Sequence, residues 1–339
     1  MQNYIYFVEV RNFALEKNTL QSMIHEMMFR TVVDIPVWKQ PITLGDRHVF
    51  LGSCFADYIG NRFIEYGLSG TVNPVGVLFN PMSIYGVIQQ SLLPDELPLF
   101  RDGERWSCWL TGTNVSEMSQ EACRQVVSDC FLSLGRSLRD ATHVFLTLGT
   151  CVCYRLKSSG LIVSNCHKQP QSLFEEYEMS LSECETVLTK TVACLTEVNP
   201  TVRVHFTVSP YRYAKYGFHR SQLAKATLLL AVEHVCREYA SNCDYFPAYE
   251  LVLDDLRDYR FFDTDMLHPN VVAVDYIWQR LVESCMDEVV PEYLRDYEPI
   301  RRAQKHVPLH PDSPQYRSFV DKIHLQNEMI KKKYAINNV

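Results

Sequence analysis

The stretch FLGSCFADYIG, residues 50–60, joins the end of an apolar run to the start of a helical pattern. The run HVFLGS (48–53) predicts a buried strand, and apolar residues at helical spacing predict a helix over 55–66. Ser53 stands at the junction, where a serine side chain commonly caps a helix. A serine between strand and helix can also be a nucleophile at the edge of a sheet. The stretch alone therefore leaves two interpretations of Ser53 open.

The rest of the chain repeats this alternation of apolar runs and helical patterns. Further strands are expected at 69–76, 143–149, 202–210 and 244–251, and further helices at 80–92, 121–139, 182–197, 221–239 and 271–286. Strands that are apolar almost throughout, separated by long helices, are typical of a parallel sheet covered on both faces. The sequence therefore predicts an α/β fold, a three-layer α/β/α sandwich with a parallel sheet of about five strands.

The pattern divides the chain into three parts. Residues 1–27 form an N-terminal extension, expected to be disordered or an overcalled start, because Met27-Met28 offers a second start. Residues 28–290 are expected to form the main α/β domain, and 291–339 a peripheral helical C-terminal tail. The segment 93–114 is rich in Pro, Gly, Trp and charged residues, and is expected to be a long loop.

Composition excludes several classes of protein. With 339 residues, 47% hydrophobic and 22% charged, the chain can bury a large core. Its formal net charge of −7 gives no basic field for a phosphate backbone, so no nucleic-acid partner is expected. The 12 cysteines lie mostly in apolar surroundings, which indicates a reducing compartment. Neither a secretory pattern nor a long uninterrupted apolar stretch occurs, so a cytoplasmic protein without a membrane partner is expected.

Polar residues follow each predicted strand. The carboxyl ends of parallel strands form one rim, where ligands bind. The set comprises Ser53, Asn73, Gly76, Thr150, Asn165, His167, Lys168, Ser209, Arg212, Tyr213 and Glu250. This density of hydroxyl, amide, imidazole and charged groups predicts a ligand site at the rim.

The segment DTDMLHP supplies the base that a serine nucleophile needs. A three-residue offset brings the Asp265 and His268 side chains near each other. The imidazole could then take the Ser53 proton while the carboxylate orients the ring. A cap serine or an Asp-x-x-His alone is common. Serine after the first strand together with this pair after the last predicts a serine hydrolase site.

Seven sequence pieces occur in an order that resembles the GSCFA family, within the GDSL/SGNH hydrolase-like superfamily. They are GSCFAD, NPVGVLFNP, LTLGT, NCHKQP, FTVSP, YFPAYEL and DDLRDYRFFDTDMLHP. The resemblance implies a flavodoxin-like sandwich of the SGNH-hydrolase type, with Ser53, Asp265 and His268 as the triad. It further implies Gly76 and the Ser53 N–H as donors to an oxyanion, a contribution worth about 3 to 4 kcal/mol per donor. No cofactor or metal is expected.

The chain departs from the superfamily pattern at the third block. That block usually reads GxND, whereas this chain has LGTCVCY, so the oxyanion asparagine is missing from its usual place. Asn165 is the first candidate to replace it, and Thr150 is the second.

Other residues of the rim carry alternative interpretations. Cys54 could be the nucleophile, but adjacent side chains at a strand end diverge, so only one of Ser53 and Cys54 can face the crevice. His167 and Lys168 either contact an anionic part of the substrate or lie in a solvated loop, and Arg212 has the same two interpretations. The charged run 254–260 is expected to form local ion pairs that fix the loop carrying Asp265 and His268.

The cysteines near the third predicted strand are candidate ligands of a metal ion. Cys151, Cys153, Cys166 and His167 lack the usual paired CxxC spacing, so buried thiols in a hairpin are the expected interpretation.

The leading hypothesis is a serine-dependent ester hydrolase or acyltransferase acting on a small O-acyl ester, such as an acetyl group on a carbohydrate-like alcohol. The partner is then a small-molecule or carbohydrate ester. The alternative is a non-catalytic binding module that keeps the fold and binds an acylated or anionic ligand. The missing GxND asparagine favours that alternative.

Overall fold

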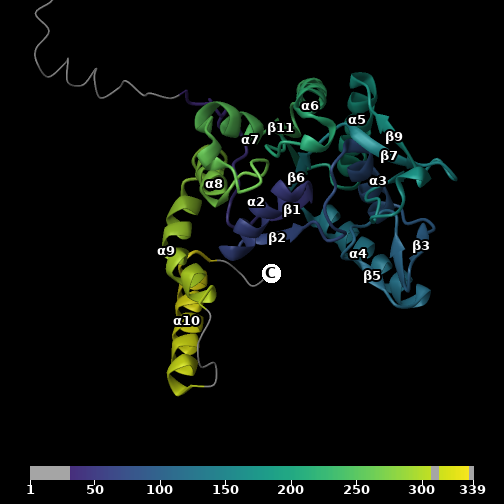
Figure 1. The fold of residues 1–339 in the computed structure, drawn as a ribbon. Coiled ribbons are helices and arrows are strands. Elements are labelled where there is room, and N and C mark those ends of the chain that lie inside the picture. The colour runs from purple at the N-terminus through teal and green to yellow at the C-terminus, as the bar shows by residue number, and fades with distance from the viewer. Residues whose placement is uncertain (1–30, 307–312, 336–339) are drawn as a thin grey trace, which may run out of the picture.

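The computed structural model describes residues 31–306 and 313–335, and the predicted extension 1–27 lies outside them. A five-stranded sheet forms the centre, in the order β11-β10-β6-β1-β2, and every neighbouring pair is parallel (Figure 1). Its strands are β1 (Arg47–Gly52), β2 (Ser69–Val72), β6 (His143–Leu148), β10 (Arg203–Val208) and β11 (Cys243–Tyr245). The predicted parallel sheet is confirmed.

Helices cover both faces of this sheet, because successive strand residues point to opposite sides. Val49 and Leu51 face one core, whereas Phe50 faces another. The first core is closed by α3 (Pro81–Leu92), α4 (Gln120–Asp140), α5 (Leu181–Val198) and α6 (Phe218–Glu238). The second is closed by α2 (Cys54–Glu65), α8 (Val271–Cys285) and α9 (Val289–Gln304). The predicted α/β/α sandwich is confirmed.

Two small antiparallel sheets lie outside the sandwich. One contains β3 (Leu99–Asp102), β4 (Arg105–Cys108) and β5 (Ser116–Glu117); the other contains β7 (Val152–Leu156), β8 (Ile162–Val163) and β9 (Phe174–Glu178). The expectation of a long loop over 93–114 is therefore wrong. Gly103, with φ of 61°, makes the tight turn that pairs β3 with β4.

The fifth strand is shorter than expected. β11 ends at Tyr245, and Pro247 has no N–H with which to continue the ladder. The chain then enters α7 (Ala248–Glu250) and a π-helix, η3 (Leu251–Leu256). The expected strand over 244–251 is correct only at its start.

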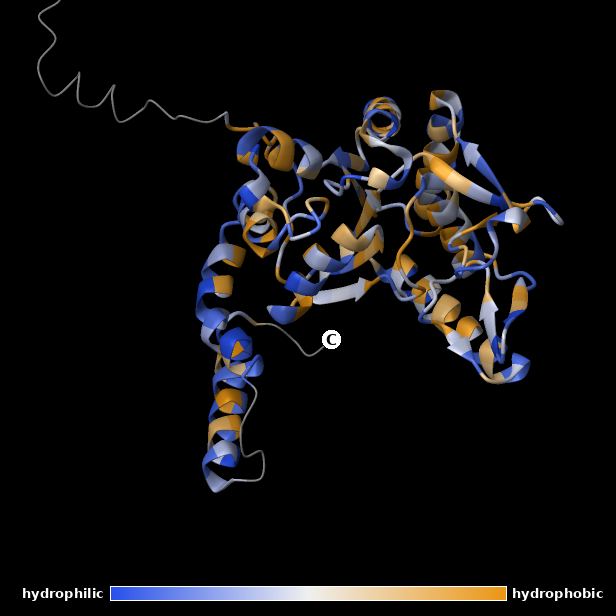
Figure 2. Cartoon of the chain, in the orientation of Figure 1, coloured by the Kyte–Doolittle hydropathy of each residue, from blue (hydrophilic) through white to orange (hydrophobic). Residues whose placement is uncertain are grey.

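The helices α9 and α10 (Pro314–Lys333) form an arm that leaves the sandwich on the side away from the small sheets (Figure 1). Hydrophilic residues prevail along the arm, whereas hydrophobic colour concentrates in the body (Figure 2). The base of the arm is nevertheless part of the second core, since Tyr293, Tyr297 and Ile300 are buried there. The boundary predicted between 290 and 291 thus falls inside α9. Within the described ranges, every helix is too short or too polar to cross a bilayer.

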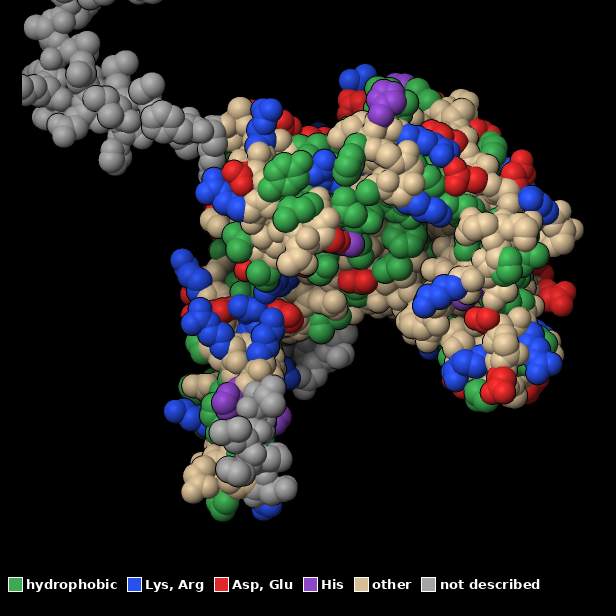
Figure 3. Space-filling model, viewed as in Figure 1, with side chains coloured by type: hydrophobic (Ala, Val, Ile, Leu, Met, Phe, Trp, Pro, Cys, Tyr) green, Lys and Arg blue, Asp and Glu red, His purple; other side chains and the backbone are tan. Residues whose placement is uncertain are grey.

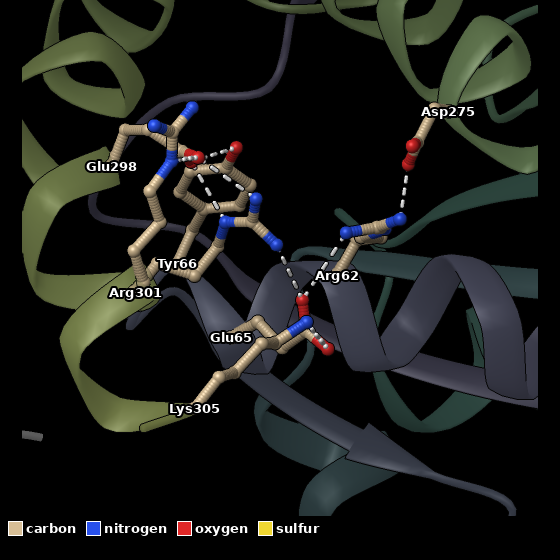
Figure 4. A network of polar contacts seen from close by, with 8 residues as sticks. Arg62, Glu65, Tyr66, Asp275, Glu298, Arg301 and Lys305 are labelled. Carbon is tan, nitrogen blue, oxygen red and sulfur yellow. Dashed lines mark hydrogen bonds and ion pairs between the residues drawn. The ribbon is translucent and has the colours of Figure 1, made fainter. Parts of the chain in front are cut away.

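A network of charged side chains joins the last turn of α2 to α8 and α9 (Figure 4). Glu65 pairs with Arg301 at 3.1 Å and with Lys305 at 2.7 Å. Arg62 bridges Glu65 and Asp275. Exposed ion pairs contribute little singly, but a network with shared partners fixes orientation. The carboxyl end of α2 is therefore fastened, while its amino end carries Ser53.

Three histidines lie side by side at the amino end of the sheet, on β1, β6 and β10. The rings of His48 and His143 are 5.6 Å apart, and those of His143 and His205 are 5.1 Å apart. His143 Nδ1 lies 2.8 Å from His205 Nε2, and Trp38 stacks on His205 at 3.9 Å. Burial lowers the pKa of His48 to about 4 and holds the pKa of His205 well below its usual value.

These buried rings should make the fold sensitive to acid. Between an unfolded pKa of 6.5 and a folded pKa of about 4, the unfolded chain binds a proton at His48 that the folded chain does not. The free energy of unfolding therefore falls as the pH falls through this window, by about 3 kcal/mol for His48 alone. Urea unfolding at a series of pH values measures this loss. His48→Phe should show a shallower decline, and His219→Gln, at an exposed site, should match the wild type.

Candidate active site

Ser53 lies at the junction of β1 and α2, as the N-cap of the helix. Its Oγ accepts a hydrogen bond from Phe55 N–H at 3.3 Å, and its side chain is buried, with 2% of the residue exposed. Gly52 precedes it with φ of 139°, a conformation that favours glycine. The junction therefore caps α2 and holds the serine at the carboxyl end of the sheet.

Asp265 and His268 form a compact turn after η4 (Tyr259–Phe261). Asp265 Oδ2 lies 2.5 Å from His268 Nδ1, while Oδ1 accepts the N–H groups of Leu267 at 2.8 Å and His268 at 3.0 Å. These bonds to backbone and imidazole lower the pKa of Asp265 to about 2. The carboxylate therefore orients the ring through Nδ1 and leaves Nε2 for another partner.

The turn and the serine lie in the same region of the rim. The Tyr211 ring packs 4.2 Å from His268, and burial, helped by the charge of Asp265, raises the pKa of Tyr211. Arg212 N–H donates to Leu267 O at 3.1 Å, which ties the loop after β10 to the turn. Among the described residues, no hydrogen bond joins Ser53 Oγ to the His268 ring.

The predicted oxyanion donors are engaged elsewhere. Ser53 N–H donates to Thr147 O at 3.0 Å, and Gly76 N–H donates to Asn73 O at 2.8 Å. Thr150 N–H donates to Phe79 O at 2.9 Å. Each would have to share or exchange its hydrogen bond to hold an oxyanion, so this role stays a prediction. Gly76 also has a packing reason, since a Cβ there would lie 2.8 Å from the Cα of Gly112.

Asn165 and Thr150 line one cavity beside the rim, which also receives Tyr213. Asn165 Oδ1 accepts His167 N–H at 2.7 Å, so the amide nitrogen remains as its donor. The structure thus brings the two candidate replacements for the missing asparagine together, although neither is hydrogen-bonded to Ser53 within the described chain.

His167 and Arg212 lie apart from the serine. The His167 ring is buried edge-on against Phe100 at 5.1 Å and Trp109 at 5.8 Å, and burial lowers its pKa. This placement contradicts the interpretation of His167 as a residue of a solvated loop. The Arg212 guanidinium lies 4.6 Å from the Phe218 ring centroid and borders a different cavity. Arg212 therefore contacts the turn of Asp265 and His268 through its backbone N–H, while its guanidinium packs on Phe218.

The charged run 254–260 is held differently from the prediction. Asp255 is buried and accepts hydrogen bonds from Tyr276 at 2.6 Å and Arg280 at 3.2 Å, both outside the run. Only Arg260 and Asp258 form an ion pair inside it, at 3.6 Å, among the described residues. The loop is therefore held by α8 and by the segment 31–33, where Val33 N–H donates to Asp255 Oδ1 at 2.5 Å and Thr31 Oγ1 donates to Asp254 O at 2.8 Å.

The cysteines do not gather into a site. All twelve are free, and burial raises the pKa of Cys54, which disfavours its thiolate. Within residues 31–306 and 313–335, no group of three His, Cys, Asp or Glu side chains could hold a metal ion.

Lys225 is a residue of this region that the sequence interpretation missed. It is 2% exposed, and its Nζ donates to Gly149 O at 2.7 Å and Ser209 O at 2.6 Å, just beyond β6 and β10. Burial lowers its pKa to about 7. The signal was present, since Lys225 shares the buried stripe of α6 with Ser221 and Leu228.

Asn73 organises the other side of the serine. Its Oδ1 accepts Gly52 N–H at 2.9 Å, and its Nδ2 donates to Asp57 at 2.7 Å. The backbone there has φ of 37°, which asparagine tolerates well. Asn73 therefore links β1, β2 and α2 around Ser53.

Hydrophobic side chains gather over the middle of one face, where a histidine and acidic side chains also reach the surface (Figure 3).

Two solved structures have a similar arrangement of chain. A catalytic mutant of an acetylxylan esterase from Geobacillus stearothermophilus is 12% identical, with 73% of this chain and 98% of that chain covered and a TM-score of 0.36. An acetyl xylan esterase from the rumen bacterium Butyrivibrio proteoclasticus is 11% identical, with 74% and 64% covered and a TM-score of 0.30. Similarity at this level carries no argument about activity.

Family models give a firmer relation. No curated protein matches the chain. The model of the GSCFA family matches residues 47–281, and the model described as GSCFA domain protein, C-terminal domain, matches residues 297–339. The first match covers well over half of the sequence, including Ser53, Asp265 and His268. The chain therefore belongs to the GSCFA family, as its sequence motifs predicted.

Proposed function

We propose that this protein is a serine-dependent ester hydrolase or acyltransferase that acts on a small O-acyl ester, with a carbohydrate-like alcohol as its other half. The observation that carries the proposal is the Asp265–His268 hydrogen bond of 2.5 Å, on the rim where Ser53 caps α2. That bond leaves His268 Nε2 as the base that a serine hydroxyl requires.

In the proposed reaction, Ser53 Oγ attacks the acyl carbon as His268 Nε2 takes its proton. His268 then returns the proton to the leaving alcohol, and Asp265 stabilises the imidazolium. Water as the second acceptor gives hydrolysis, and another alcohol gives transfer. The mechanism requires Ser53 Oγ and His268 Nε2 to approach to about 2.6–3.2 Å when substrate is bound.

A fluorophosphonate probe tests the proposal directly. We expect it to label the wild-type protein and to fail with Ser53→Ala and His268→Ala. A folded wild-type protein that neither takes the label nor hydrolyses p-nitrophenyl acetate would contradict the proposal.

The second candidate is a non-catalytic binding module. It is favoured by the engaged N–H groups of Ser53 and Gly76 and by the absence, among the described residues, of a bond from Ser53 to His268. The probe separates the two candidates, because a binding module would remain unlabelled.

The twelve free thiols support the proposal that the protein works in the cytoplasm.

Asp265→Asn should lower kcat/KM by about 10²- to 10⁴-fold, because the ring loses the carboxylate that fixes its tautomer. Hydrolysis of p-nitrophenyl acetate measures the change. Asp263→Asn is the matched control: Asp263 Oδ1 accepts Thr264 N–H at 2.7 Å and does not bond to the imidazole. Equal losses in the two variants would contradict the role of Asp265.

A further inference from the structure

A cavity of about 160 Å³ opens beside the rim, between the β7–β8 hairpin and η2 (Ala214–Tyr216). Its walls include Phe79, Thr150, Ser164 and Tyr213. Phe79 O accepts Thr150 N–H at 2.9 Å, and the adjacent Leu78 N–H donates to Gly52 O at 2.8 Å. The cavity wall is therefore continuous with the backbone that presents Ser53.

Ser164 lines this cavity and carries a hydroxyl that forms no hydrogen bond among the described residues. The residue is 5% exposed. A buried hydroxyl without a partner costs stability, so such groups commonly await a ligand or water. Asn165 offers its amide nitrogen, since only its oxygen is used, in the bond to His167 N–H. The Tyr213 hydroxyl likewise lacks a hydrogen bond within the described chain.

Among the described lining residues of the cavity, Lys215 is the only charged one. Lys215 Nζ donates to Tyr154 Oη at 2.5 Å, and the same hydroxyl donates to Glu176 at 3.1 Å. Among the described lining residues there is no carboxylate. Lys215 is exposed, and its Nζ lies 4.6 Å and 5.3 Å from the centroids of the Tyr154 and Tyr216 rings, so the rest of the described wall carries no charge. That uncharged part of the wall suits a neutral ligand.

Aromatic rings form the apolar part of the walls. Tyr213 and Tyr216 stack with centroids 5.4 Å apart, and Phe79 meets Tyr213 edge-on at 6.3 Å. Rings combined with a few uncharged hydrogen-bonding groups suit a ligand with apolar faces and hydroxyls at its edge. A sugar ring has this chemistry.

We infer that this cavity binds the neutral, hydroxylated ring of the alcohol half of the ester, with Ser164, Asn165 and Tyr213 as its polar contacts. The inference rests on the proposed function, because it assigns a subsite to that substrate.

Binding of free sugars to the full chain tests the inference without any chemistry. Saturation-transfer NMR with xylose and glucose at millimolar concentrations should give signals, and inorganic phosphate should not displace them. Ser164→Ala should weaken sugar binding about 3- to 10-fold without lowering Tm, because the removed hydroxyl has no partner in the free protein. Tyr213→Ala should weaken it at least about tenfold.

Ser91→Ala is the matched control, since Ser91 is an equally buried serine whose Oγ donates to Val87 O at 2.8 Å in α3. It should lower Tm and leave sugar binding unchanged. Absence of sugar binding, displacement by phosphate, or equal affinity in Ser164→Ala would each overturn the inference. Ser53-dependent turnover of p-nitrophenyl acetate, which carries no sugar, would in those cases leave the proposed function standing.

Discussion

Ser53→Ala should lower kcat/KM for p-nitrophenyl acetate by at least about 10³-fold, equivalent to about 4 kcal/mol of transition-state stabilisation. The reason is that the acyl group loses its covalent acceptor, while the remaining rim still binds the ester. His268→Ala should give a loss of similar size, and the double variant should be little worse than either single variant. Initial-rate kinetics on the purified variants measure these effects.

The N-cap position of Ser53 calls for a control, since alanine there also costs about 1 kcal/mol of helix stability. Glycine caps helices almost as well as serine but has no hydroxyl. If lost activity came from a weakened cap, Ser53→Gly would recover it. Cys54→Ala should keep its activity, and a loss there equal to that of Ser53→Ala would transfer the nucleophile to the thiol.

Gly52→Ala should destabilise the protein by about 4 kcal/mol or more. A Cβ at this position would lie 2.2 Å from Thr147 O and 2.8 Å from Thr147 C, and both are backbone atoms of the neighbouring strand. The φ of 139° adds strain for any residue with a side chain. Urea unfolding measures the loss, and a stability equal to that of the wild type would contradict this account of the junction.

Gly86→Ala provides the comparison for that experiment. Gly86 lies inside α3, and a Cβ there would meet nothing within 4 Å. The same substitution should therefore raise the free energy of unfolding by about 0.5–1 kcal/mol, because alanine favours the helix.

The sequence predicted the sandwich because its central strands are almost wholly apolar. β1, β6 and β10 were expected within two residues of their observed ends, and the buried stripes of the long helices were equally distinct. The strands β3 and β4 were missed because they are short and of mixed polarity, and their pairing depends on the Gly103 turn. Such pieces become strands only through their partners.

The sequence could predict which residues form the candidate site, but it could not predict the hydrogen bonds in which they are engaged. The spacing of Asp265 and His268 is local, so the sequence could indicate their proximity. Whether the Ser53 N–H is available depends on the parallel register of β1 with β6, which pairs Gly52 with Thr147. No local pattern encodes that register. Lys225 could have been found, because a charged residue on a buried helical stripe requires an explanation.

Glu65, in the last turn of α2, pairs with residues of the carboxyl-terminal region, and Ser53 caps the other end of the same helix. The carboxyl-terminal region therefore influences the position of the serine. A twelve-residue helix is a rod about 18 Å long, so a tilt at one end displaces the other. Arg301 and Lys305, which grip Glu65, both fall within the segment matched by the C-terminal family model. A truncation made before residue 297 would remove the two cations that pair with Glu65, while the Arg62–Asp275 pair remains. It would also remove Tyr297 and Ile300 from the second core, against which α2 packs, so the loss would reach the helix that carries Ser53.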